Sequence, residues 1–389
     1  MAPTPVRARW AISAQFFTNG VLGGSLLPRF PEIKTTYGLN DLTYGFVLMA
    51  MPLGALFAMT VAGPLIRRFG ALRVAATFTV IYAALLALAG ASPNVVMFAG
   101  AMLLAGVCDN ILDSGQNVHG LAVERWSGKS IINSMHAAWS LGATLGGLIG
   151  ATCASMGISV GWQMAVSALV WSAVAVGAAL AGAVPERFVR SAVPSADDGS
   201  PLPSPSRRFP WKLFIPLAIL AIAGTLVEEI ANNWVTLFLH REQGAAIGLA
   251  GIGFAITLGA QFVGRLVGDP MTDRFGRATV ARWGGLLIAG GGVLAIASPW
   301  VALSMIGFAL AGFGTATLVP AAFAAADSLP GVAHGTGVAM VGWWMRLGFM
   351  LTSPVVGALA EGIGLRLALL VMVGGGVAAA AMAGKGRRS

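Results

Sequence analysis

The chain has few charged residues for its length, and few cysteines. Charged residues make up 10% of the 389 positions, against about 25% in an average soluble domain, whereas hydrophobic residues make up 57% and the mean hydropathy is +0.80. This composition excludes an ordinary water-soluble globule and predicts a protein that lies in a bilayer. Cys108 and Cys153 both lie within apolar runs, so neither a disulfide framework nor a thiolate metal site is expected.

The chain also lacks the motifs of common enzymes and ATPases. No H-E-x-x-H or G-x-S-x-G motif is present, and the four histidines are spread over different segments, so we expect no enzyme, no metal site and no bound cofactor. The absence of a Walker motif excludes ATP-driven transport by this chain alone. A ligand sensor without transport activity is a further alternative, but it would normally carry a larger soluble output region.

What the chain does contain is an internal repeat. A shift of 206 residues places Arg68-Phe69-Gly70 on Arg274-Phe275-Gly276, and no gap is needed over about 75 residues (70 + 206 = 276). The same shift places Gly106 on Gly312 and Leu141-Gly142 on Leu347-Gly348. Two copies of one hydrophobic unit are typical of a device with two halves that move, so transport is the first functional hypothesis.

Twelve apolar segments follow one another, six in each copy of the repeat. Backbone groups in lipid must pair internally, so we predict an all-α protein with twelve transmembrane helices in two six-helix bundles. Residues 185–210 are rich in proline, serine and charge, which indicates a solvated linker between bundles at 1–184 and 211–389. The first segment lacks a signal-peptide cleavage site and is expected to be retained. The segments are about 10–30, 43–66, 72–91, 94–118, 131–157, 160–183, 211–239, 246–268, 279–297, 300–326, 336–360 and 364–384.

The basic residues predict the orientation in the membrane. With the N-terminus in the cytoplasm, 19 of the 24 Lys and Arg residues fall on the cytoplasmic side, including those of the 67–73 and 265–282 regions. This asymmetry follows the positive-inside rule, so the net charge of +9 is a topology signal rather than a nucleic-acid-binding patch. We expect an inner-membrane protein with both termini in the cytoplasm. The other five are Arg29, Lys34, Arg241 and Arg366 outside and Arg346 within a span.

Two loops carry a known motif. The carrier signature of the major facilitator superfamily, G-x-L-x-D-R-x-G-R-R, is similar to the stretch Gly63-Pro64-Leu65-Ile66-Arg67-Arg68-Phe69-Gly70-Ala71, and a weaker copy lies at 269–277. The chain resembles this superfamily over essentially its whole length, and residues 26–34 resemble a bacterial branch distantly similar to sugar and fucose permeases. The resemblance implies the major facilitator fold, with two pseudo-symmetric bundles and alternating access by a monomer.

The signature residues are expected to act in conformational change. Short glycine-containing loops with fixed charges can pair differently in two states, although they could simply anchor the loops at the cytoplasmic surface. The acidic position of the first copy is Arg67, whereas the second copy keeps Asp273, so a lock built on this acid would be asymmetric. The predicted conformational residues are Gly63, Arg67, Arg68, Gly70, Asp269, Asp273, Arg274, Gly276 and Arg277.

Ionisable residues within the spans are the main candidates for chemistry, because a charge at the bilayer centre costs at least ~2.5–3.5 kcal/mol. Asp109 and Asp113 lie four residues apart and so share one face of the fourth span. Asp109 lacks an obvious basic partner, which makes it a candidate for proton coupling, since low dielectric disfavours an isolated ionised carboxyl. Asp113 could also carry protons, or could clamp Arg68 or Arg73, as the resemblance implies.

The seventh span carries two acids and two amides. Glu228 shares a face with Asn232, and Glu229 with Asn233, and at least one pair is expected to face a polar cavity. Arg346 lies near the middle of the eleventh span. Two interpretations stay open for it: the counter-ion of an acid such as Glu228, or a ligand for an anionic or hydroxyl-rich solute.

Polar and indole side chains near mid-membrane complete a predicted solute site. Few polar groups among aromatic walls are typical of small-ligand sites and would suit a sugar or polyol, although each indole could equally pack against helices or lipid. His136 could relay protons or make a structural hydrogen bond. The predicted solute-binding residues are Gln15, Asn19, Asn117, His136, Trp139, Asn232, Gln261, Trp343 and Arg346.

Together these patterns predict a secondary transporter that imports a small polar solute with protons. Its predicted partners are the solute, protons and the lipid bilayer, and its candidate proton-coupling residues are Asp109, Asp113, Glu228 and Glu229. The alternative is a proton antiporter that exports a small organic compound. The glycines of 142–147 are similar to the fifth-span motif of drug antiporters, but its proline is missing, and small residues also serve close helix packing.

Overall fold

The computed structural model is helical in all the regular structure that it describes. The described residues are 4–128, 131–185, 188–189, 210–327, 329–330, 332 and 336–384, apart from the side chains of Asn133 and Asp269. Most of the predicted linker at 185–210 lies outside them. The chain forms two compact units, Met1–Tyr37 with Val47–Asp198, and Gly38–Phe46 with Gly199–Ser389.

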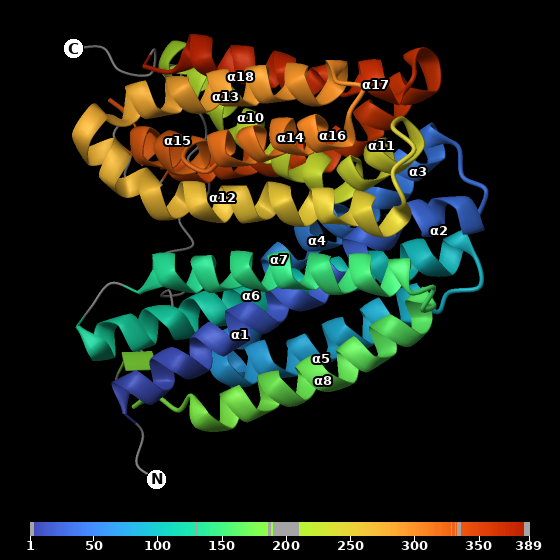
Figure 1. Ribbon diagram of the computed structural model, residues 1–389. Helices are drawn as coiled ribbons and strands as arrows, with labels where there is room; N and C mark the ends of the chain where they lie inside the picture. Colours follow the sequence, from blue (N-terminus) through green and yellow to red (C-terminus); the bar gives the residue numbers. More distant parts are fainter. Residues whose placement is uncertain are drawn as a thin grey trace. The chain divides into compact units, whose positions relative to one another are not determined.

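The first unit is a bundle in which α1 lies among the other long helices (Figure 1). Helix α1 (Pro5–Leu26) packs against α5, α6, α7 and α8. Side chains cap several helix starts; Thr4 and Asn94, for example, accept hydrogen bonds from the backbone N–H groups of Arg7 and Met97. The remaining elements are η1 (Leu27–Arg29), α2 (Phe30–Thr36), α4 (Ala50–Phe69), α5 (Ala71–Gly90), α6 (Val95–Ser127), α7 (Ile132–Ser155) and α8 (Val160–Ala181).

The second unit is built around α10 and α13. Helix α10 (Trp211–Asn233) packs against α15, α16 and α18, and α13 (Arg277–Ala297) packs against α14 and α18. The short helix α3 (Asp41–Leu48) starts within the stretch 38–46 that belongs to this unit. The other helices are α11 (Val235–Arg241), α12 (Ile247–Phe275), α14 (Val301–Thr315), α15 (Leu318–Asp327), α16 (Thr336–Ile363), α17 (Leu365–Ala368) and α18 (Leu370–Met382).

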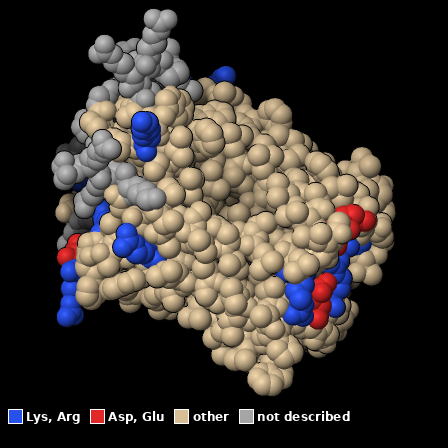
Figure 2. Space-filling model, turned by 90° about the horizontal axis from the view of Figure 1, so that it is seen from above, with Lys and Arg blue, Asp and Glu red and all other residues tan. Residues whose placement is uncertain are grey.

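All twelve predicted spans coincide with helices or closely spaced helix pairs. Among the described residues, ten helices are long and apolar enough to cross a membrane. The other two predicted spans are α1 and α16, helices of 22 and 28 residues that carry more polar groups. Figure 2 shows one face of the molecule on which charged side chains gather toward the two ends and leave an uncharged zone between them.

The repeat is preserved in the backbone. Gly70 and Gly276 end α4 and α12 with φ of 86° and 81° and ψ of 142° and 147°. Each N–H bonds the carbonyl four residues earlier, and the next helix begins one residue later. This positive φ is costly for any residue with a side chain, so the signature glycines are required by the turn. We call the end of each unit that carries Gly70 or Gly276 its signature end.

A second repeat-related feature is a close helix crossing. A Cβ atom on Gly106 would overlap the backbone carbonyl of Met51, and one on Gly312 would overlap that of Thr257. Met51 and Thr257 are themselves related by the 206-residue shift (51 + 206 = 257). Each unit therefore joins two helices, α4 with α6 and α12 with α14, at a point where only glycine fits.

This crossing predicts the effect of adding one methyl group. Gly106→Ala should destabilise the protein by about 1–3 kcal/mol, because the helices must separate to admit the methyl group. Gly100→Ala on the same helix is the matched control, since a Cβ there has no neighbour within 4 Å. Thermal unfolding in detergent measures both variants. Equal melting temperatures for Gly106→Ala and Gly100→Ala would contradict the crossing.

Candidate functional site

Glu229 lies in the last turn of α10 and is enclosed by neutral polar groups. Only 2% of the residue is exposed. Its Oε1 accepts hydrogen bonds from Asn233 Nδ2 at 2.6 Å and from Ser353 Oγ at 2.9 Å. Asn233 Nδ2 and Trp234 Nε1 each lie 3.2 Å from Ser353 Oγ and donate to it. Within the described part of the chain, no basic side chain pairs with Glu229.

The same cluster holds residues 38–46, which we call the docked segment. The Tyr44 hydroxyl donates to the backbone carbonyl of Asn233 at 2.9 Å, and the Tyr44 ring meets the Trp234 indole edge-on with centroids 5.2 Å apart. Asn233 therefore contacts both groups: its side-chain amide binds the Glu229 carboxyl, and its backbone carbonyl binds Tyr44 of the docked segment. A change at Glu229 can reach Tyr44 through this one residue.

An ion pair and close backbone contacts complete the docking. Arg241 Nη1 donates to both carboxylate oxygens of Asp41, at 2.7 and 2.8 Å. The backbone N–H of Asp41 donates to Glu361 Oε2 at 3.0 Å. A Cβ atom on Gly45 would overlap the Ser353 carbonyl, so the segment lies directly against α16. The sequence assigned residues 38–46 to the first bundle and missed these contacts, which explain their place in the second unit.

Glu228 has a basic partner, but not the expected one. Gln261 Nε2 donates to Glu228 Oε2 at 3.0 Å, and Arg265 Nη2 lies 3.7 Å from the same oxygen. The sequence counted Arg265 with the cytoplasmic residues of the 265–282 region; α12 continues past it to Phe275, and the Arg265 side chain lies beside Glu228 of α10. The expectation that Arg346 is the counter-ion of Glu228 is therefore wrong.

Arg346 lies in α16 and is half-buried. Within the described residues it has no ion pair or hydrogen bond. Ser353 follows it by seven residues, which is two helical turns, so both side chains lie on one face of α16. That face carries the docked segment at Ser353 and Gly357. The role of Arg346 as a solute ligand stays a prediction.

Asp109 of α6 is a carboxyl of the first unit with a similar setting, although the repeat does not relate it to Glu229. It is half-buried, and the side-chain amide of Asn19 on α1 hydrogen-bonds it. Asp113 and Tyr82 lie close enough for electrostatic interaction with it. No basic side chain pairs with Asp109 in the described part of the chain. Asn117 Nδ2 donates to Asp113 Oδ1 at 3.0 Å, so Asn117 continues the polar face that carries Asp109 and Asp113.

The other predicted solute ligands differ in accessibility. Gln15 and Asn19 are buried in the first unit, and Gln261 is buried in the second. Trp139 and Asn232 are half-buried. His136 and Trp343 are exposed, and the His136 ring meets Phe16 edge-on at 5.4 Å. The structure thus brings Asn19 to Asp109, Asn117 to Asp113 and Gln261 to Glu228, while a solute-binding role for each stays a prediction.

The signature residues lie at the expected loops. Gly63, Arg67 and Arg68 belong to the end of α4, and the Arg68 guanidinium lies 5.2 Å from the Phe69 ring centroid. Arg274 and Phe275 repeat this contact at 5.3 Å at the end of α12. Asp273 is exposed and has no ion pair within the described residues, and Arg277 begins α13. The Asp269 side chain lies outside the described part.

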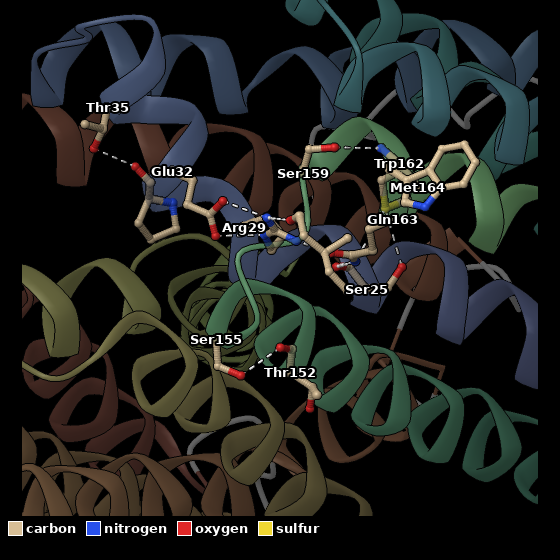
Figure 3. Close-up of polar contacts among 12 residues, drawn as sticks. Ser25, Arg29, Glu32, Thr35, Thr152, Ser155, Ser159, Trp162, Gln163 and Met164 are labelled. Atoms are coloured by element: carbon tan, nitrogen blue, oxygen red, sulfur yellow. Dashed lines mark hydrogen bonds and ion pairs between the residues drawn. The ribbon is translucent and has the colours of Figure 1, made fainter.

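Sequence reasoning missed a buried arginine at the opposite end of the first unit (Figure 3). Arg29 was counted among external loop cations, but only 1% of it is exposed. It binds both oxygens of Glu32 at 2.8 and 2.7 Å, the carbonyl of Ile158 at 2.6 Å, and the side-chain oxygen of Gln163. Glu32, three residues later on a helix, was the available signal. Because the hydrogen-bond donors of this guanidinium bind groups of the protein itself, Arg29 links η1 and α2 to α8.

The glycines compared with the antiporter motif have a packing role. Cβ atoms on Gly142 and Gly146 would overlap or crowd backbone atoms of Phe17 and Val21 on α1. Gly20 makes the reciprocal approach to the Trp139 carbonyl on α7. These residues let α1 and α7 pack backbone to backbone, which accounts for them without an antiport function.

Comparison with protein families identifies the family to which this helical protein belongs. A model of the Major Facilitator Superfamily matches residues 12–244 and 217–386. The chain belongs to the major facilitator superfamily. As a member of this family it is a multi-pass membrane transporter of small molecules, of the secondary-transporter class. The family is one of transporters, and two of the relatives described next are named as transporters.

Relatives of this transporter cover nearly its whole length. The uncharacterised transporter y4wD of Sinorhizobium fredii is 29% identical over 364 residues, 93% of each chain. The membrane protein MosC of Rhizobium meliloti is 27% identical, over 94% of this chain and 87% of its own. An uncharacterised MFS-type transporter of Yersinia pestis is 28% identical, over 89% and 87%.

Solved structures share the fold. The nucleoside transporter NupG aligns with a TM-score of 0.74 at 16% identity, over 98% of this chain and all of its own (100%). The D-xylose-proton symporter aligns with a TM-score of 0.71 at 17% identity, over 99% of each chain. At these identities the likeness shows the fold alone.

The Arg29 cluster predicts a large stability effect. Arg29→Met should destabilise the transporter by about 3–5 kcal/mol, because Gln163 and the carbonyl of Ile158 lose their donor while Glu32 loses its cation. Arg7→Met, which removes an exposed arginine near the start of α1, is the control. Thermal unfolding in detergent separates the two. A melting temperature of Arg29→Met within error of Arg7→Met would show that the cluster contributes nothing.

Proposed function

We propose that this transporter takes up a small polar solute together with protons, and that Asp109 and Glu229 are the carboxyls that gain and lose them. One observation carries the proposal: each unit has a carboxyl whose hydrogen-bonding partners are neutral, Asn19 for the half-buried Asp109 and Asn233 with Ser353 for the buried Glu229. A cation such as Arg265 beside Glu228 compensates an ionised carboxylate. A carboxyl without one is suited to exchange a proton.

Proton binding at Glu229 has a route to the docked segment. The ionised carboxylate holds Asn233 and Ser353 by charge-assisted hydrogen bonds, which are roughly twice as strong as neutral ones. A proton removes that charge and loosens Asn233, whose carbonyl binds the Tyr44 hydroxyl. In the proposal, protonation thus weakens the docking of residues 38–46 and favours a state in which the solute path is open at that end.

The solute is proposed to be uncharged or anionic and rich in hydroxyl groups. The amides of Asn232 and Gln261 and the guanidinium of Arg346 offer donors to such a molecule. The nucleoside transporter NupG and the D-xylose-proton symporter have the same fold, which makes their solutes reasonable probes. The basic loop residues support an inner-membrane orientation with both termini in the cytoplasm.

Export by proton antiport is the second candidate in our proposal. The sequence feature that favoured antiport was the glycine run at 142–147. Glycines of this run allow α7 to pack closely against α1, so packing alone explains them. Import is therefore the favoured direction. The two differ in the sign of the proton flux that a solute drives.

Proton movement in proteoliposomes tests the coupling. With a pH-sensitive dye inside, an external solute should acidify the lumen; D-xylose, uridine, lactate and ethidium serve as probes. Asp109→Asn and Glu229→Gln should each abolish solute-driven proton flux, because the amide cannot carry the proton. Glu124→Gln, at a partly exposed acid whose carboxyl accepts hydrogen bonds from the backbone N–H groups of Ile131 and Ile132, should leave it intact.

The sign of the proton flux and the behaviour of the two variants distinguish symport, antiport and uncoupled transport. Alkalinisation of the lumen on addition of a solute would replace symport by antiport and keep the carboxyl assignment. Full proton flux in both Asp109→Asn and Glu229→Gln would remove that assignment. Solute uptake without any proton flux in the unmodified protein would refute proton coupling.

A further inference from the structure

The contact between α1 and α6 contains polar side chains that no functional assignment explains. Gln15 and Thr18 of α1, with Gln116 and His119 of α6, are each at most 2% exposed. Gln116 Nε2 donates to the backbone carbonyl of Gln15 at 3.2 Å, which joins the two helices at this level. We call these four residues the polar seam.

Most polar atoms of the seam have no partner within the described residues. These atoms are both side-chain atoms of Gln15, the hydroxyl of Thr18, Oε1 of Gln116 and Nδ1 of His119. A buried polar group without a hydrogen bond costs about 1–3 kcal/mol, so protein interiors rarely keep several together. Groups that retain such unsatisfied capacity at one place point to a small hydrogen-bonding ligand between them.

Another buried glutamine in the same unit shows that the seam is unusual. Gln163 donates through Nε2 to the Ser25 carbonyl at 2.8 Å and accepts from Arg29 through Oε1. Its side chain is only slightly more exposed than that of Gln15, yet both of its ends are occupied. The first unit therefore satisfies buried amides elsewhere, which sets Gln15 and Gln116 apart.

The seam runs from Asp109 toward the signature end. Asn19 on α1 hydrogen-bonds Asp109 on α6, and Gln15 meets Gln116 further along both helices. His119 lies ten residues beyond Asp109, about 15 Å along α6. Its Nε2 lies 2.9 Å from the carbonyl of Gly182, just past the end of α8. The unsatisfied atoms thus lie along the contact between α1 and α6, from near the level of Asp109 to that of His119, which is on the side of the signature end.

The two ring nitrogens of His119 suit it to the part of the seam nearest the signature end. A carbonyl oxygen can only accept, so the His119 nitrogen beside Gly182 carries the hydrogen and donates it. The other nitrogen, Nδ1, is then an acceptor, and it is buried without a partner among the described residues. The amides of Gln15 and Gln116 can both donate and accept, and they carry no charge that would trap a proton.

We propose that the polar seam holds a file of water molecules along which protons pass between Asp109 and the signature end of the first unit. This inference rests on the proposed proton coupling. A proton leaves the Asp109 carboxyl for the nearest water, each water passes on a different proton, and one proton emerges at the end, so charge and atoms balance. The titratable groups beside Asp109 are Asp113 and Cys108 of α6 and Tyr82 of α5. Protons then leave by a route separate from the solute.

Time-resolved infrared spectroscopy of the full-length protein in lipid nanodiscs tests the seam without a solute. A light-triggered pH jump changes the protonation of Asp109, whose carboxyl C=O band is identified by its loss in Asp109→Asn. Thr18→Val and Gln116→Leu should each lower the rate at which this band responds to the pH jump by about tenfold or more. The reason is that loss of the polar group leaves a gap without water, which interrupts proton transfer. Thr79→Val is the matched control, since its equally buried hydroxyl bonds the Ala75 carbonyl on its own helix.

Each outcome decides between the two proposals. Slow responses in both seam variants, with melting temperatures like that of Thr79→Val, support the water file. If the Asp109 band titrates and its response rate is unchanged in Thr18→Val, the proposed water file is refuted and the proposed proton coupling is not. Because Thr18→Val is isosteric, this conclusion holds even if Gln116→Leu fails to fold. A wild-type protein without any titrating Asp109 band refutes the proposed proton coupling itself, and the seam with it.

Discussion

An ionisable side chain inside an apolar bundle is costly unless it has a partner, reaches water or changes its protonation state, and this constraint distinguishes the buried acids of the transporter from one another. Arg29 and Glu228 follow the first course, since each has an oppositely charged neighbour. Asp109 and Glu229 have only neutral hydrogen-bonding partners within the described residues. The same physical rule thus separates structural charges from the two carboxyls that we propose as proton carriers.

The repeat supplies the scaffold but not the chemistry. Both units turn at a glycine with the same backbone angles, and both cross two helices at a glycine that touches a carbonyl. The polar residues diverge: Asp109 corresponds to Thr315 (109 + 206 = 315), whose hydroxyl bonds the Gly224 carbonyl at 2.7 Å. Glu229 corresponds to Gly23 (229 − 206 = 23). The two units thus share features of their helix packing, whereas the carboxyls that we propose as proton carriers lie at different points in each unit.

The helices and signature loops could be predicted because each follows from local sequence. A long apolar run requires a helix in lipid, and Gly70 and Gly276 occupy turns that need a positive φ. The partners of the site residues could not be predicted, because they depend on which helices meet. Ser353 carries no sequence signal that distinguishes it from other serines in spans, yet it binds Glu229 and Trp234. Arg265 was not recognised as a partner of Glu228, because a charge near the end of an apolar run does not indicate which helix it meets.

Distances between spin labels, measured at mildly acidic and mildly alkaline pH, test the central claim that proton binding moves the two units. Labels at the exposed, repeat-related positions Arg73 and Thr279 report on the signature ends, and labels at Pro93 and Pro299 report on the opposite ends. The account predicts that acid lengthens the Pro93–Pro299 distance and shortens the other, and that Glu229→Gln keeps the acid-state distances at either pH. Distances that do not change with pH, or that change equally at both ends, would contradict it.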